Sequence, residues 1–211
     1  MYIPKHFRQE DKQAIAQLIR EFGFATLISA KNDQPFATHI PLELEEQNDE
    51  WILHGHMARA NEQWQNFETN PNVLAVFIGP HTYVSPSWYS HANVPTWNYM
   101  AAHLSGKIKL IEGEALIQSL QKLMQRYENT HAQTPQSFDE IPPNMLKADL
   151  HGLVGFEIKV EKIEASFKLS QNRNAQSYAS IIEHLKKLNA YHAFIPWRVA
   201  ARHCPVGQPI D

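Results

Sequence analysis

The chain has 211 residues, of which 43% are hydrophobic, and a formal net charge of −3 with its histidines neutral. This length and composition predict a single globular domain with a sizeable core, with or without a helical appendage. The charge excludes a broadly basic surface of the kind that clamps nucleic-acid phosphates. The chain has no apolar run as long as the ~18 residues of a membrane span, no apolar signal core and only one cysteine, Cys204, so we expect a cytoplasmic protein.

The first elements expected are a helix and a strand hairpin. Residues 11–22 predict a helix, with Asp11 as its N-cap and apolar residues along one face. Residues 24–30 and 36–44 predict two strands joined by a turn, as in a β-hairpin. Pro41 cannot donate a hydrogen bond to a neighbouring strand, so it predicts an edge or a bulge in the second of these strands.

The middle of the chain continues with short strands. Residues 51–55 predict a third strand, and a short helix is expected to begin near Asn61. A fourth strand is expected at 73–78, and strand-like stretches cover roughly 81–89 and 103–112. Many short strands with inserted helices favour an antiparallel barrel over a parallel sheet.

The last part of the chain is expected to be mainly helical. Amphipathic stretches predict helices at about 114–129 and 174–188, packed on the barrel. The intervening segment 130–150 is expected to be irregular with one helical turn, and the tail 189–211 is expected to be irregular too. Residues 154–163 alternate between apolar and polar side chains, which predicts a strand buried on one face.

Four polar and aromatic segments lie at the ends of expected strands, where loops usually present ligand-binding groups. In the first of them, Arg59 lies between a strand and the helix expected near Asn61. A helix N-terminus offers free N–H groups, and an arginine adds a fork that fits a phosphate, so Arg59, His56 and Asn61 predict a phosphate cradle. The alternative is that Arg59 forms a surface ion pair and that Asn61 is simply an N-cap.

The second segment, 168–173, repeats this pattern before the last helix. Lys168 and Arg173 supply positive charge, and Ser170 or Asn172 is expected to cap the helix. Taken alone, the segment favours a solvated helix entry over a ligand site.

The other two segments, Ser85–Tyr89 and Pro95–Tyr99, combine aromatic rings with hydroxyl and amide groups. Tryptophan and tyrosine supply a flat apolar face with a polar handle. Packing at the ends of a barrel explains some of these rings, but it explains the polar residues between them less well. The segments therefore predict contacts to a ring-containing ligand, from Ser85, Trp88, Trp97 and Asn98.

The twelve histidines raise the question of a metal site. His54 and His56 would point to the same face of a strand, as metal-binding pairs can. No His-Glu-x-x-His or other carboxylate–histidine pattern accompanies them, so we expect no metal. The nucleophile pattern G-x-S-x-G, the G-x-G-x-x-G motif and the Walker loop are also absent, which argues against acyl transfer and against a Rossmann or P-loop nucleotide site.

Together these segments resemble the PaiB family of FMN-binding negative transcriptional regulators. The matching pieces occur in order along nearly the whole chain: Met1-Tyr-x-Pro, Phe24-Ala-Thr-Leu27, Ala37-Thr-His-x-Pro-Leu42, Gly55-His-x-Ala-Arg-Ala-Asn61, Gly79-Pro80, Tyr83–Tyr89, Pro95–Tyr99, Val154-Gly-Phe-Glu-Ile158 and Phe167–Arg173. So many motifs in register make a chance match improbable.

The resemblance implies an antiparallel split β-barrel of the pyridoxamine-phosphate-oxidase-like type, which binds FMN at a homodimer interface. It implies that two adjacent strands and the loop into the next helix hold the flavin phosphate. It also implies that the hairpin containing Ser85 lies near the isoalloxazine ring or the dimer partner. The residues predicted to bind the cofactor are Thr38, His39, His54, Gly55, His56, Arg59, Asn61, Ser85, Trp88, Trp97, Asn98, Lys168 and Arg173.

Three functions stay open at this point: a regulatory FMN-binding protein, a flavin-dependent oxidoreductase acting on a small substrate, and a haem-binding split barrel. The regulatory role comes from the resemblance alone. Direct DNA binding is doubtful, because no basic recognition helix is visible and the last helix carries only Lys186 and Lys187 near its end.

Overall fold

The computed structural model describes residues 1–188, so the tail predicted to be irregular lies outside the described residues. Its strands are Arg8–Gln9 (β1), Phe24–Lys31 (β2), Gln34–Pro41 (β3), Glu43–Gln47 (β4), Glu50–Ala58 (β5), Asn72–Val84 (β6), Thr96–Ile111 (β7) and Leu153–Lys168 (β8). Its α-helices are Lys12–Glu21 (α1), Gly113–His131 (α2), Pro143–Gly152 (α3) and Ala175–Lys187 (α4). Short 3₁₀ helices occupy Lys5–Phe7 (η1), Glu62–Asn66 (η2), Pro86–Trp88 (η3) and Phe138–Glu140 (η4).

The strands form one sheet in the order β3-β2-β6-β7-β8-β5-β4, and β1 pairs with β8. The pairings of β2 with β3 and β6, and of β5 with β4 and β8, are antiparallel. These pairings confirm the antiparallel, mainly β class expected from the sequence. None of the helices in residues 1–188 is long and apolar enough to cross a membrane.

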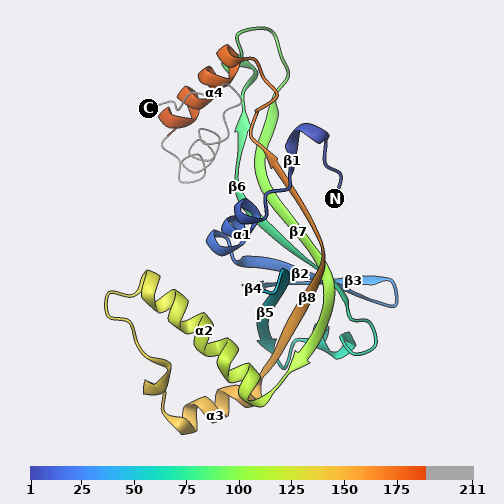
Figure 1. Cartoon of the computed structure of the whole chain (residues 1–211), viewed down its shortest axis with the longest axis vertical. Helices are drawn as coiled ribbons and strands as arrows, with labels where there is room; N and C mark the ends of the chain where they lie inside the picture. The colour runs from blue at the N-terminus through green and yellow to red at the C-terminus, as the bar shows by residue number, and fades with distance from the viewer. Residues whose placement is uncertain (189–211) are drawn as a thin grey trace. The chain divides into compact units, whose positions relative to one another are not determined.

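The chain forms two compact units, and the long strands β6, β7 and β8 contribute residues to both (Figure 1). Unit A comprises residues 1–22 and 77–103 and the described residues from 164 onward. Unit B comprises residues 23–76 and 104–163.

The core of unit A is built around two amphipathic helices. Asp11 accepts hydrogen bonds from two main-chain N–H groups of α1 and is its N-cap, as predicted. The buried face of α4 contributes Ile181 and Leu185 to a cluster with Val84 and Tyr89. Burying such side chains stabilises a fold by about 1.5–3 kcal/mol each, so this cluster helps to hold α4 against the segment that contains η3.

The core of unit B follows the alternation of its strands. In β5, Trp51, Leu53 and Met57 are buried, while His54 and His56 lie on the opposite, half-buried face. Gly55 lies on the buried face, where a Cβ atom would come within 2.7 Å of both Leu42 and Phe156, so only glycine fits there.

Two details of unit B confirm sequence predictions. The β2–β3 hairpin turns at Asn32 and Asp33, whose positive φ angles of 49° and 61° suit the twist of a tight hairpin. Pro41 is the last residue of β3, and β3 is an edge strand, so the missing N–H breaks no central pairing.

The single strand predicted over 36–44 is wrong, because Leu42 divides it into β3 and β4. The N–H group of Leu42 donates to the carbonyl of Gly23 at 2.9 Å, directly beyond Phe24 and Pro41, the last paired residues of β2 and β3. The chain then crosses to β5, so that β3 and β4 lie at opposite ends of the strand order.

Four further predictions need correction. The segment 130–150 includes most of α3, a helix of ten residues that ends at Gly152, rather than a single turn. The helix expected near Asn61 is a 3₁₀ helix of five residues, and the strand expected over 81–89 ends at Val84. Neither Ser170 nor Asn172 caps α4; Asn174 does, through a hydrogen bond from the N–H group of Ser177.

Candidate functional site

Arg59 follows the end of β5 in unit B and contacts the end of α3. Its Nε and Nη2 atoms donate to the carbonyls of His151 and Leu153 at 2.9 and 2.8 Å. Its main-chain N–H group donates to the carbonyl of Gly152 at 2.7 Å, and the guanidinium lies 5.9 Å from the ring centre of Trp64. A cation at the last carbonyls of a helix is favourable, so Arg59 acts as a clamp on α3.

Thr38 and Asn61 are brought together as predicted, through a hydrogen-bond network on Gln63. The Asn61 amide donates to Thr38 Oγ1 at 2.9 Å, and Thr38 Oγ1 donates to Gln63 Oε1 at 2.5 Å. Gln63 Nε2 in turn donates to the carbonyl of Leu27 and to Ser29, both at 3.1 Å. Asn61 also caps η2, the role that the alternative interpretation gave it, and this network fixes the loop after Arg59 against β2 and β3.

Sequence reasoning missed Gln63, which is only 1% exposed. Its position one turn into an expected surface helix gave no sign of burial, and its partners are 25 to 36 residues away. Only its spacing of two residues from the N-cap Asn61 connects it with the predicted cradle.

His39 lies apart from Thr38, because neighbouring residues of a strand point to opposite faces. Its Nδ1 atom lies 2.9 Å from Thr26 Oγ1, and its ring stacks on Phe24 at a centroid distance of 6.4 Å. Phe24 is 67% exposed, so this pair of rings forms an apolar patch on the outer face of the β2–β3 hairpin.

His54 belongs to a charged cluster between β4, β5 and α2. Its Nε2 atom lies 3.3 Å from Glu45 Oε2, which also accepts a hydrogen bond of 2.7 Å from Lys122. That bond from Lys122 lowers the pKa of Glu45, although partial burial opposes the shift. Arg126 and Glu43 form a second ion pair beside it, so the cluster attaches α2 to β4.

His56 shares the half-buried face of β5 with His54. Burial lowers the pKa of His56, so its imidazole is neutral at pH 7. Among residues 1–188, no three His, Cys, Asp or Glu side chains are grouped as metal ligands.

A cavity of about 260 Å³ has Arg59 on its wall. The remaining lining comes from the end of β7, the beginning of α2, the end of α3 and the beginning of β8. It is mostly apolar and includes Ile111, Leu116 and Val154. Ligand pockets usually measure about 300–1,000 Å³, so this cavity is small for a drug-sized ligand enclosed by one chain.

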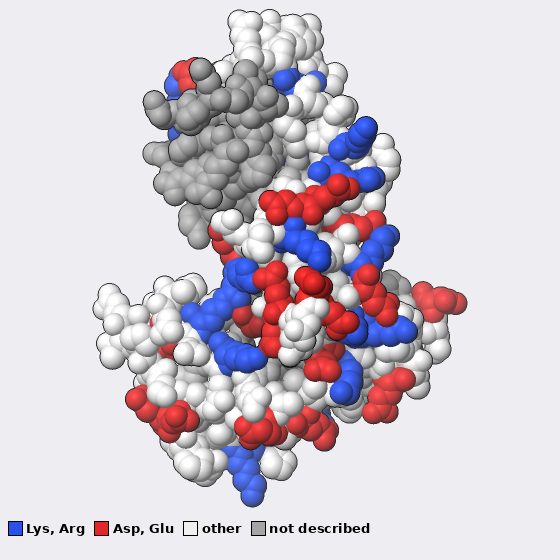
Figure 2. Space-filling view, viewed as in Figure 1, with Lys and Arg blue, Asp and Glu red and all other residues white. Residues whose placement is uncertain are grey.

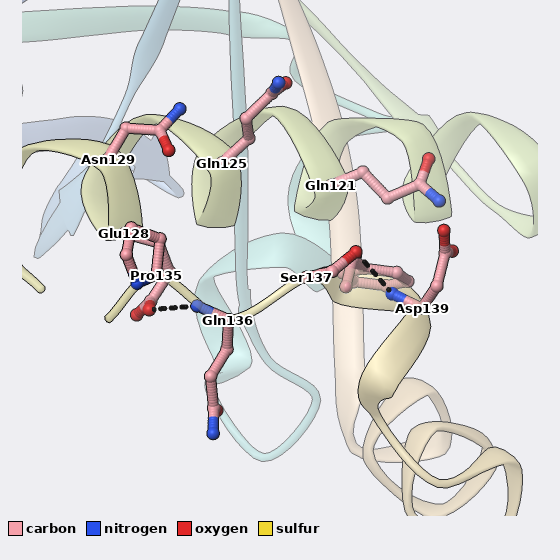
Figure 3. A pocket seen from close by; sticks show the side chains of 9 residues that line it. Gln121, Gln125, Glu128, Asn129, Pro135, Gln136, Ser137 and Asp139 are labelled. Carbon is pink, nitrogen blue, oxygen red and sulfur yellow. Dashed lines mark hydrogen bonds between the residues drawn. The ribbon is translucent and has the colours of Figure 1, made fainter.

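A larger hollow of about 440 Å³ lies between α2 and the segment Pro135–Asp139 (Figure 3). Gln121, Gln125 and Asn129 line it, and the N–H group of Gln136 donates to Glu128 across it. The lining contains two carboxylates and no lysine or arginine, so this hollow does not suit a phosphate.

In unit A, Asn98 of β7 and Lys168, the last residue of β8, both lie beside the loop that follows β8. Lys168 Nζ donates to Thr96 Oγ1 at 2.6 Å, and the buried Ser170 hydroxyl donates to Asn98 Oδ1 at 3.0 Å. Burial and the nearby charge of Arg173 lower the pKa of Lys168.

Arg173 lies over the ring of Tyr89, with its guanidinium carbon 5.0 Å from the ring centre. The Nε atom of Arg173 and the hydroxyl of Tyr89 are both buried without a hydrogen-bond partner. The adjacent Trp88 stacks on His184 of α4 at a centroid distance of 5.1 Å, so this tryptophan has a packing role.

Trp97 and Ser85 occupy exposed positions in unit A. The indole N–H of Trp97 donates to His81 at 3.3 Å, and Tyr83 packs edge-on against the same ring. Trp97 and Tyr83 are 49% and 46% exposed, so they form an aromatic surface patch on β6 and β7. Ser85 caps η3 and pairs with Ser87.

Charges of both signs are interspersed on the face shown in Figure 2. Opposite charges also pair across neighbouring strands of unit B, as in Lys109–Glu157 and Lys159–Glu50. This face therefore presents no extended basic surface to a nucleic-acid backbone.

Residues 1–162 match the family model described as "Putative FMN-binding domain". Over 88% of its length the chain is 43% identical to the "Protease synthase and sporulation protein PAI 2" of Bacillus subtilis (strain 168), and it covers 89% of that protein. The chain belongs to the PaiB family of FMN-binding proteins. FMN is the cofactor that this membership assigns, as the resemblance implied.

Solved structures show the fold of this PaiB family member. The flavocytochrome Anf3 of Azotobacter vinelandii matches 84% of the chain with 78% of its own, at a TM-score of 0.62 and 13% identity. The FAD and heme binding protein of Mycobacterium smegmatis matches 76% of the chain with 73% of its own, at a TM-score of 0.55 and 13% identity. The antiparallel split β-barrel expected from the sequence is thereby confirmed.

The donor groups of unit B are chemically suited to a flavin phosphate. An arginine has five N–H donors, and the clamp on α3 uses two of those of Arg59. The Asn61 amide uses one of its two N–H donors on Thr38. The remaining donors lie on a loop whose position the Gln63 network fixes.

Proposed function

We propose that this protein is a flavin-responsive regulator that works as a homodimer and holds the FMN phosphate at Arg59. The observation that carries the phosphate assignment is the clamp on α3, which fixes the guanidinium while leaving three of its N–H donors for a ligand. A cation fixed before binding loses little side-chain entropy when the ligand arrives.

Asn61 and Thr38 support the same assignment. Their network with Gln63 holds the loop after β5 in one conformation, and Asn61 keeps one amide donor for a phosphate oxygen. His39, His54 and His56 are proposed to line the approach to the flavin, with His56 neutral because burial lowers its pKa. Gly55 would serve by allowing β5 to pack closely against Leu42.

Four of the residues predicted in unit A are proposed to face the ring system or the second subunit: Ser85, Trp88, Trp97 and Asn98. Trp97 is the best candidate for the dimer interface, because exposed aromatic patches are enriched in interface cores. Ser85, Trp88 and Asn98 would help to shape this region. The small volume of the Arg59 cavity also favours a site completed by a second chain.

FMN, when bound, supplies one- and two-electron redox chemistry. Within this chain the proposed tasks are to hold the phosphate, to orient the flavin and to exclude water from it. Whether a small substrate is oxidised or reduced there, and whether haem binds instead, stay alternative predictions.

The protein is proposed to act as a regulator in the cytoplasm without contacting DNA directly. The formal charge is −3, and the face in Figure 2 intersperses both signs. Non-specific DNA binding depends on phosphate contacts and has typical dissociation constants of about 10⁻⁴–10⁻⁶ M. Anisotropy titration with duplex fragments is expected to show no tighter or sequence-selective binding, with or without FMN; nanomolar, selective binding would restore a direct repressor.

The phosphate assignment is tested by comparing FMN with riboflavin, which lacks the phosphate. A charged hydrogen-bond pair contributes about 1.5–3 kcal/mol, so FMN should bind at least about tenfold more tightly. Titration of the apo protein with each flavin, followed by quenching of flavin fluorescence, measures the ratio. Equal affinities would remove the phosphate cradle from the proposal.

A further inference from the structure

The loop that follows β8 in unit A is held in one strained conformation. Ser170 has a φ of +64°, in the left-handed region that side chains other than glycine rarely adopt, and it is 2% exposed. Its hydroxyl donates to Asn98 Oδ1 at 3.0 Å, and its carbonyl accepts from the N–H group of Arg173, also at 3.0 Å. Such strain persists only where the surroundings enforce it, and it gathers at ligand sites.

Gln171 closes the same loop from the other side. Its amide oxygen accepts from the N–H group of Leu169 at 2.7 Å, and its amide nitrogen donates to the carbonyl of Phe167 at 2.6 Å. The loop is therefore fixed by side-chain bonds to its own main chain. It presents Lys168 and Arg173 in a defined arrangement.

Two polar groups beside this loop lack hydrogen-bond partners. The Nε atom of Arg173 is buried and donates to nothing, and the same is true of the hydroxyl of Tyr89. Tyr89 is only 9% exposed, and its ring lies under the Arg173 guanidinium. Buried polar groups are nearly always satisfied, and leaving one unpaired costs about 1–3 kcal/mol. Two unpaired donors together indicate an acceptor that belongs between them.

The charges point to the same acceptor. Among residues 1–188, neither Lys168 nor Arg173 forms an ion pair with a carboxylate, and Lys168 donates to the neutral hydroxyl of Thr96 instead. Two partly buried cations repel one another, and Arg173 accordingly contributes to the lowered pKa of Lys168. An anion placed between them would offset this repulsion.

We propose that Lys168, Arg173 and Tyr89 form a second site, in unit A, that binds the phosphate or carboxylate group of a small ligand other than FMN. Both cations lie outside residues 1–162, the range matched by the family model described as "Putative FMN-binding domain". FMN carries one phosphate, which Arg59 can hold. The unpaired donors and the two cations belong to unit A alone, but the exclusion of FMN from this site rests on the proposed assignment of its phosphate to Arg59.

The test uses the full chain, labelled with ¹⁵N in its arginines, in FMN-free and FMN-saturated form at constant ionic strength. Inorganic phosphate and acetate are titrated separately while the Nε–H signals are recorded by NMR. The signal of Arg173 is assigned as the one that disappears in Arg173→Gln. It is expected to shift saturably, with a dissociation constant of about 1 mM or less and equal values in both forms.

Variants separate the proposed site from general charge effects, with binding measured by calorimetry. Arg173→Gln and Lys168→Gln should each weaken anion binding by about tenfold or more. Arg8→Gln, which removes an exposed arginine of the same unit, should leave the affinity unchanged. Tyr89→Phe should weaken binding several-fold without lowering the melting temperature, because it removes a hydroxyl that has no partner in the protein.

The two titrated anions distinguish the sources of the ligand group. Tighter binding of phosphate identifies a phosphate-bearing ligand, and equal or tighter binding of acetate identifies a carboxylate. Absence of saturation, displacement of the anion by FMN, or an equal loss of affinity in Arg8→Gln would each overturn the proposal. Displacement by FMN would place Lys168 and Arg173 in the flavin site.

Discussion

Arg59 in unit B and Arg173 in unit A both follow the end of a strand, but their donors are used differently. Arg59 is exposed, yet two of its side-chain N–H groups are bound to carbonyls at the end of α3. Arg173 is partly buried, and its Nε atom has no partner. Exposure alone is therefore a poor guide to function. An exposed arginine can be fixed by the main chain, and a shielded one can lack the group that would satisfy it.

The largest effect expected is on flavin affinity. Arg59→Ala should weaken FMN binding by about tenfold to a hundredfold through the loss of charged hydrogen bonds, whereas Arg173→Ala should change it by less than about threefold. Quenching of flavin fluorescence measures both constants. The reverse result would exchange the roles of the two arginines.

Arg59→Ala should also lower the melting temperature of the apo protein, because the carbonyls of His151 and Leu153 lose their donor. Arg59→Lys provides the matched control, since it keeps the charge but loses the fork. If Arg59→Ala melts early and keeps its affinity for FMN, Arg59 is structural only.

The next effect expected is on stability, and it tests whether the strained loop of unit A is held as tightly as described. Ser170→Ala keeps the left-handed backbone but leaves Asn98 Oδ1, in a residue that is 2% exposed, without its donor. The free energy of unfolding should fall by about 1–3 kcal/mol in urea denaturation. A loss below about 0.5 kcal/mol, the range of ordinary surface substitutions, would show that the loop is loosely held.

A twofold difference is expected in mass. The chain mass is 24.3 kDa, and light scattering at micromolar concentration should give about twice that value for a dimer. Trp97→Arg should shift the protein toward the monomer if the patch on β6 and β7 is the interface. Phe24→Arg changes the exposed patch of unit B in the same way and is the comparison variant. A monomer that binds FMN with full affinity would contradict the dimeric site.

The smallest effect expected is a pH dependence from His56. Burial lowers the pKa of His56 below its ordinary value of 6.5, so the unfolded state takes up the proton first as the pH falls. The free energy of unfolding should therefore decrease as the pH is lowered through 6.5 toward the pKa of the folded state. Between pH 7.5 and 5.5, His56→Gln should lose less stability than the unchanged chain. The stability that the variant still loses is partly due to His103, whose pKa is also lowered by burial.

Local signals in the sequence predicted much of the fold. Asp11 and Asn61 were recognised as caps because their bonds lie within three residues. In contrast, α3 was missed because its apolar face is short: none of its residues is buried, and only Leu146 and Leu150 are half-buried. The break at Leu42 was missed because residues 36–44 read as one strand, and its two halves differ only in their partner strands, β2 and β5.

The candidate site was predictable only in outline. The motif around Arg59 carried the family resemblance, but the partners of Arg59 lie 92 and 94 residues further along the chain. Gln63 was missed because a polar residue in a short helix is normally solvated, whereas here it is buried by contacts with two strands. The predicted set also divides between two units, which motif spacing alone cannot show.

The clamp on α3 makes the order of that helix and the binding of a phosphate reciprocal. If one guanidinium serves both, the two equilibria are linked. The factor by which a bound phosphate changes the strength of the hydrogen bonds to His151 and Leu153 equals the factor by which attachment of the helix changes the affinity for FMN. Because α3 has no buried side chain, its attachment depends on such main-chain contacts more than on packing. The helix is thus the segment of unit B through which another protein could detect whether the cofactor is present.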